Sequence, residues 1–153
     1  MMGHIPKNAK WYVAEIVEEI TVEDDPRNVV HINLVLIRAD SPDEAYELAL
    51  QLGKRGETEY ENPSNKQVSI RFRGLKSLGV VYDGLEHGAE IQYSERIAMP
   101  KQEIEKLITS KEQLDVFTPI SQPTGPDYSS REILEEAMRI VHQDSEAQNY
   151  KTK

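Results

Sequence analysis

The sequence predicts an α+β fold, with a mainly antiparallel sheet in strand-strand-helix-strand-strand order and a helical C-terminal extension. Three observations predict it: apolar residues alternate at 10–39, a capped helical pattern follows at 41–52, and alternation returns at 66–73. A helix between two pairs of strands is typical of a sheet with helix packed on one face. The 153 residues fit one domain, or one domain with an appendage.

The first two segments, residues 10–23 and 29–39, have the composition and period of long strands. In the first, one face carries the better apolar set, which is Tyr12, Ala14, Ile16, Ile20 and Val22. In the second, one face carries Val30, Ile32, Leu34 and Leu36, all aliphatic, and the other includes His31 and Asn33. A turn at 24–28 contains Pro26, which fixes φ. We therefore predict an antiparallel hairpin.

A helix follows this hairpin. Ser41 suits the N-cap, Pro42 the first helical position, and Glu44 completes a capping box. Its buried stripe is Ala45, Leu48, Ala49 and Leu52. Two glycines weaken its end, and the polar residues 57–65 read as a loop that ends in a turn.

Two more strands are expected after the loop. Residues 66–73 alternate, with Val68, Ile70 and Phe72 on one face, and Gly74 marks a bulge or bend before an apolar stretch at 78–82. After a loop from 83 to 88, we expect a fourth strand at 89–97.

The chain changes character near residue 99. We expect a flexible N-terminus at 1–9, an α+β core at 10–98, and a helical extension at 99–153 with a Pro-rich linker at 118–128. A helix predicted at 129–143 has Ser129 as its cap and Glu132 in a capping box. The extension either covers its own sheet or docks on a neighbouring subunit.

Several motifs together resemble a known family. They are Trp11-Tyr12-x-Ala14, the junction Leu36-Ile37-x-Ala39-x-Ser41-Pro42-x-Glu44-Ala45-Tyr46-x-x-Ala49, the polar pair Tyr60 and Asn62, Ile70-x-Phe72, and Ala89-Glu90-Ile91. They resemble a family of small bacterial proteins known only as a domain of unknown function, over roughly residues 10–96. The resemblance implies a domain boundary and no particular activity.

Composition excludes several function classes. The chain has 18 Lys and Arg against 27 Asp and Glu, a net charge of −9, which disfavours binding to nucleic acid or to anionic membrane. Without cysteine there is no disulfide, thiolate metal site or cysteine nucleophile. No apolar run approaches the length of a membrane span or signal peptide. We expect a bacterial-type cytoplasmic protein with no cofactor.

The hairpin offers a polar patch. If the turn pairs residues of opposite parity, Glu18 lies opposite Asn33 and shares one face with His31. Arg71 and Arg73 join them if the third strand neighbours the second. A carboxylate beside an imidazole is suited to binding a ligand or to acid–base chemistry. Ordinary cross-strand polar pairs are the alternative.

Two charge features complete the candidates. Residues 62–82 contain no acid and residues 11–26 no base, so we expect Arg71 and Arg73 to meet carboxylates, within the subunit or across an interface. The loop at 83–90 holds His87 among carboxylates, but its spacing matches no metal motif, and we expect solvated charges there.

These observations favour a non-enzymatic binding or assembly module that forms a homo-oligomer, most simply a homodimer, with room for a protein partner. The alternative is a small ligand-binding domain or enzyme that uses Glu18, His31, Asn33, Arg71 and Arg73. A nucleic-acid-associated regulator would depend on the basic strand alone, and four cations in an acidic chain are a poor footprint for it.

Overall fold

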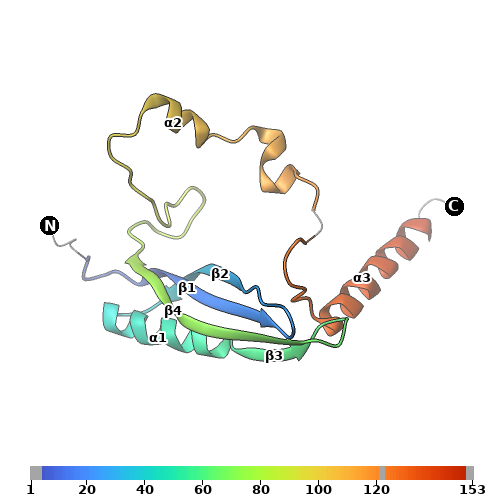
Figure 1. The fold of residues 1–153 in the computed structure, drawn as a ribbon. Helices are drawn as coiled ribbons and strands as arrows, with labels where there is room; N and C mark the ends of the chain where they lie inside the picture. The colour runs from blue at the N-terminus through green and yellow to red at the C-terminus, as the bar shows by residue number, and fades with distance from the viewer. Residues whose placement is uncertain (1–4, 121–122, 151–153) are drawn as a thin grey trace.

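The computed structural model describes residues 5–120 and 123–150, with side chains to residue 144. Its strands and helices are β1 (Trp11–Val22), β2 (Val29–Arg38), α1 (Pro42–Arg55), β3 (Thr58–Glu61), β4 (Gln67–Val80), α2 (Lys101–Lys106) and α3 (Arg131–Tyr150), with short 3₁₀ turns at Lys111–Gln113 and Asp115–Phe117 (Figure 1). The sheet order is β2-β1-β4-β3 and every pairing is antiparallel. The predicted α+β class and the strand-strand-helix-strand-strand order are confirmed.

The sheet has two unlike faces. The covered face carries the even-numbered residues of β1, and α1 packs on it (Figure 1). The open face carries the odd-numbered residues of β1 and the even-numbered residues of β2. In the observed register Glu18 lies opposite His31, and Ile16 lies opposite Asn33. This register differs by two residues from the predicted one, so each residue keeps its predicted face.

The core forms where α1 meets the covered face. Ser41 caps the helix by accepting a hydrogen bond from the Glu44 N–H at 3.1 Å. The buried positions of α1 are small, namely Ala45, Ala49 and Gly53, so the helix lies close to the strands. The strand side of the core is Tyr12, Ala14, Ile16, Ile37 and Ala39. A β-carbon placed on Gly53 would lie 2.4 Å from the Phe72 ring, so this close approach requires glycine.

Strand β4 is one long strand that contains two bulges. Opposite β1 it has two extra residues, Arg73 and Lys76, and Gly74 lies between them with a φ of 141°. The bulges allow Phe72, Leu75 and Leu78, which are spaced three apart, to pack on the same core. The predicted bulge at Gly74 is therefore correct, and the apolar stretch after it continues the same strand.

One strand was expected in the wrong place. Residues 89–97 have no regular secondary structure, so the fourth strand predicted there is wrong. The sheet nevertheless has four strands, because β3 lies inside residues 57–65, the segment predicted to be a polar loop. Its four residues include two glutamates, and only Tyr60 is half-buried, because β3 is an edge strand that needs no apolar pattern. The C-terminal helix begins at Arg131, and the Ser129 hydroxyl donates to Asp127.

The C-terminal extension arcs away from the sheet and then returns to it. After a loop whose residues 90–93 lie against the sheet, the chain swings out, and α2 has no buried residue (Figure 1). The chain then reaches the end of the sheet near the β3–β4 turn, where α3 starts and projects outward (Figure 1). Across the described ranges 5–120 and 123–150, no helix has the length and apolar character needed to cross a membrane.

Replacing Gly53 with alanine should lower the free energy of unfolding by about 1–2 kcal/mol. At a contact of 2.4 Å with the Phe72 ring, overpacking costs about 2–3 kcal/mol, the upper part of the usual range, and the higher helix propensity of alanine offsets about 1 kcal/mol. Urea unfolding measures the change. A β-carbon on Gly79 would sit 3.9 Å from Val13, so Gly79→Ala is the matched control and should cost nothing. Equal stabilities for the two variants would contradict this packing.

Candidate functional site

The polar patch predicted on the hairpin forms in part. Glu18, His31 and Asn33 share the covered face beyond the end of α1, and the Asn33 amide donates to Glu18 Oε2 at 2.9 Å. A β-carbon on Gly56 would lie 2.6 Å from Glu18 Oε1, so the carboxylate rests against the C-terminal end of α1. The shared face of these three residues, expected from parity alone, is confirmed.

Arg71 and Arg73 do not join this patch. Strand β4 neighbours β1 and β3 rather than β2, and both arginines meet carboxylates on the open side of the sheet. Arg71 pairs with Glu59, and Arg73 Nε lies 3.8 Å from Glu19 Oε1. The expectation that these arginines meet carboxylates is confirmed, within one chain. The five residues therefore divide into two groups on opposite faces.

The returning chain is fastened to the end of the sheet by a segment that we call the strap, residues 124–131. Three side chains of the core donate hydrogen bonds to its main-chain carbonyls: Arg27 to Thr124 at 3.1 Å, Asn62 to Asp127 at 2.9 Å, and Tyr60 to Tyr128. The Tyr128 ring packs edge-on against His31, with centroids 5.4 Å apart. The extension therefore docks on its own sheet, one of the two arrangements left open by the sequence.

Asn62 holds the strap and the β3–β4 turn together. Its side chain is only 2% exposed. Its Oδ1 accepts from the N–H groups of Ser64 (3.0 Å) and Lys66 (2.9 Å), while its Nδ2 reaches the strap. From the sequence, Asn62 was expected in a turn and, with Tyr60, in the family motif. No local pattern indicates that it also binds a segment 65 residues away.

A groove lies between the strap, the first turns of α3 and the covered face. It has a volume of about 950 Å³. Ile20 and Ile70 line it from the sheet, and Ile133 and Leu134 line it from α3. Its polar lining includes Glu18, His31, Tyr60, Tyr128 and Arg131. Two of the predicted site residues, Glu18 and His31, thus line this groove.

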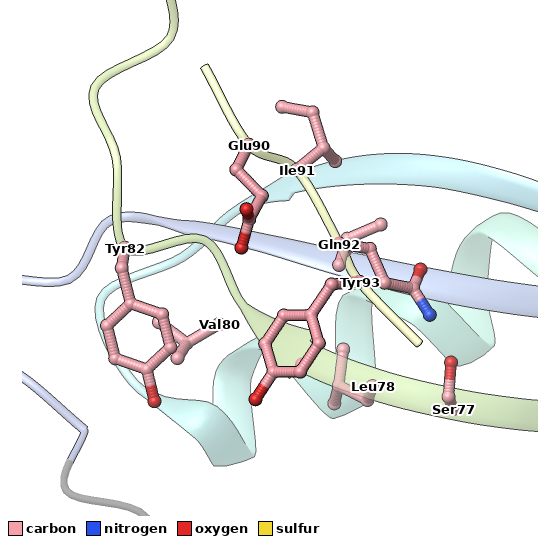
Figure 2. Close-up of a pocket in the computed structure, with 10 residues that line it drawn as sticks. Ser77, Leu78, Val80, Tyr82, Glu90, Ile91, Gln92 and Tyr93 are labelled. Atoms are coloured by element: carbon pink, nitrogen blue, oxygen red, sulfur yellow. The ribbon is translucent and has the colours of Figure 1, made fainter. Parts of the chain in front are cut away.

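The open face is only half covered. Residues 90–93 pass over its β1–β4 side, where Gln92 donates to Glu15 at 2.8 Å, and leave a hollow of about 270 Å³ (Figure 2). The Gln92 amide and the Lys76 ammonium hold the pKa of Glu15 below its ordinary value. The β2 side remains bare: Val30, Ile32, Leu34 and Leu36 are each between 44% and 56% exposed.

A hydrogen bond links the two ends of the loop at 83–90. Asp83 Oδ2 accepts from the Glu90 N–H at 3.1 Å. Within the part of the chain that the structure describes, no three His, Asp or Glu side chains gather as a metal site would require.

Ionisation of Tyr60 should release the strap at alkaline pH. Burial, together with the neighbouring Tyr128 and Asp127, raises the pKa of Tyr60 above its ordinary value near 10. Because the folded pKa is raised, the attachment is complete below about pH 10 and is lost as pH rises through the folded pKa. The absorbance at 295 nm, compared between wild type and Tyr60→Phe, isolates this titration. Ionisation of Tyr60 at or below pH 10 would contradict it.

Replacing Asn62 with alanine should loosen the strap. The change removes three hydrogen bonds at a buried site and should lower stability by about 1–3 kcal/mol. Tryptic cleavage after Arg131 should accelerate, because the protease needs a locally opened chain. Asn8→Ala, at an exposed position, is the control and should leave the rate unchanged. The same cleavage rate in both variants would show that Asn62 does not hold the strap.

Comparison with known proteins gives one match. The family model of a domain of unknown function, DUF4288, matches residues 11–94, more than half of the chain. No curated protein and no solved structure matches. The matched region contains the whole sheet, α1, and the Tyr60 and Asn62 side chains that receive the strap, whereas the strap lies outside it. The chain therefore belongs to the DUF4288 family of domains of unknown function.

Proposed function

We propose that this protein is a binding and assembly module rather than an enzyme, and that two copies associate through the outer edge of β2. The proposal rests on one observation: β2 is a long edge strand whose side chains on the open face are aliphatic and exposed. A bacterial cytoplasm suits such a cysteine-free, acidic chain, and we propose that location too.

The two edges of the sheet differ in a way that supports this proposal. The β3 edge has four residues and carries Glu59 and Glu61, so it is short and charged, as protected edges are. The β2 edge has ten residues and contains no acid. Within the described chain, no backbone hydrogen bond joins its outer side to another segment. An edge of this kind is a template for pairing with another strand.

The sequence of β2 also suits pairing with a second copy of itself. In an antiparallel register centred on Asn33, Val30 would lie opposite Leu36 and Ile32 opposite Leu34, so all four pairs on the open face would be aliphatic. A net charge of −9 opposes close approach elsewhere on the surface, whereas β2 brings no carboxylate to the contact. Such pairing would create one sheet of eight strands, four from each copy.

Light scattering coupled to gel filtration should give twice the 17.5 kDa chain mass at micromolar concentration. Leu34→Lys should weaken the association by about 30-fold or more, because an ammonium left unpaired in the contact costs roughly 2 kcal/mol. Ile97→Lys adds the same charge at a position that is 84% exposed, and should leave the mass unchanged. A wild-type monomer, or a Leu34→Lys dimer as tight as wild type, would contradict the proposal.

A further inference from the structure

The covered face continues beyond the end of α1, and the groove lies over this continuation. Helix α1 ends at Arg55, and past it the sheet offers the partly buried Ile70 as apolar lining, above the fully buried Ile20. The strap and the first turns of α3 form the opposite wall, where Ile133 and Leu134 add aliphatic surface. Ile133 is 69% exposed, so apolar side chains face one another across a space that the described chain leaves open.

The lining of this groove is acidic. Four carboxylates border it, Glu18, Glu59, Glu61 and Glu132, against a single basic residue, Arg131. By the strand register, Glu59 and Glu61 lie on the open-face side of β3, where Glu59 pairs with Arg71, so their carboxylates do not face a ligand in the groove. The Arg131 guanidinium donates to Asn65 and to the Pro63 carbonyl. Glu18 and Glu132 are therefore the acids of the groove itself.

Glu18 is the carboxylate best positioned to pair with a cation of a ligand. Its Oε2 accepts from Asn33, and its Oε1 lies where Gly56 leaves room. Its neighbours are therefore a neutral amide and the C-terminal end of α1, which carries partial negative charge. Among the described residues no Lys, Arg or His nitrogen lies within 4.0 Å of it in an ion pair. A fixed carboxylate without a cation, beside apolar surface, is complementary to a basic amphipathic ligand.

We propose that the groove binds a basic amphipathic peptide segment of another protein. A Lys or Arg of the peptide would pair with Glu18, and its apolar side chains would lie between Ile70 and the exposed aliphatic side chains at the start of α3. A second copy of this chain fits less well, because its charge of −9 has the same sign as the lining. This site is separate from the β2 edge and does not depend on the association proposed there.

Fluorescence anisotropy on the full chain tests the groove with a defined probe. The probe is a fluorescein-labelled 14-residue helix of Lys and Leu, with Leu at i, i+3, i+4 and i+7, and its partner has Glu in place of Lys. We expect the Lys peptide to bind and the Glu peptide to show no binding. Glu18→Gln should weaken binding by about fivefold to tenfold. Glu86→Gln, which removes the same charge outside the groove, should change it by less than about twofold.

A matched pair of variants on α3 tests how much apolar contacts contribute to binding of the Lys peptide. Ile133→Ser should weaken binding of the Lys peptide by about fivefold, whereas Ile140→Ser, on the same helix outside the groove lining, should leave it unchanged. Leu34→Lys should also leave it unchanged, so failure of this proposal and failure of the β2 association can be told apart. Circular dichroism confirms that each variant is folded.

Four results would overturn the inference. Equal binding of the Lys and Glu peptides, or equal affinities in wild type and Glu18→Gln, would show that the groove does not select a cation. Equal weakening of peptide binding by Glu18→Gln and Glu86→Gln would show that only the net charge of the protein matters. If Glu18→Gln changed the mass measured by light scattering and left peptide affinity unaltered, the occupant would be a second copy of the chain.

Discussion

A single helix has to cover a sheet that is nearly twice as long. Helix α1 has 14 residues and is therefore about 21 Å long, whereas β1 has 12 residues and spans about 40 Å. The helix covers one end of this face, and its Gly53 packs closely against the Phe72 ring. The other end of that face and the whole open face need different cover. Apolar area left in water loses about 25 cal/mol per Å², so each uncovered region requires an explanation.

Segments without regular secondary structure cover part of these two regions. On the open face, residues 90–93 lie over the side where β1 meets β4, held by Gln92 on Glu15. At the far end of the covered face, the strap is tied by Tyr60 and Asn62. Both segments are held by hydrogen bonds to side chains of the core rather than by strand pairing. Two surfaces remain uncovered in the described chain, the β2 side of the open face and the groove, and they carry the two proposals.

The regular part of the fold could be predicted because its signals are local. The Ser41 cap and the alternation around Ile16 each act within a few residues, and parity was enough to place Glu18, His31 and Asn33 together. The register differed by two residues because turn length, rather than alternation, sets it.

The remainder depends on long-range contacts. Strand β3 was missed because an edge strand needs no apolar pattern, and the pairing of β4 beyond Gly74 could not be predicted because its bulges shift Phe72 and Leu75 out of strict alternation. The strap could not be predicted as a docked segment, because Tyr60 and Asn62 bind its main-chain carbonyls and leave no pattern in its side chains. Arg71 could be matched to a carboxylate by charge, but not to Glu59 in particular, because that pairing depends on β3.

Residue-level amide hydrogen exchange along β2, followed as the protein concentration rises, shows whether two copies pair through this strand. Alternate amides of Val29–Arg38 bond to β1, and the intervening ones point away from the sheet. We expect these outward amides to become protected at concentrations where the mass doubles, because a second β2 then accepts from them. Free exchange of the outward amides at every concentration would contradict it.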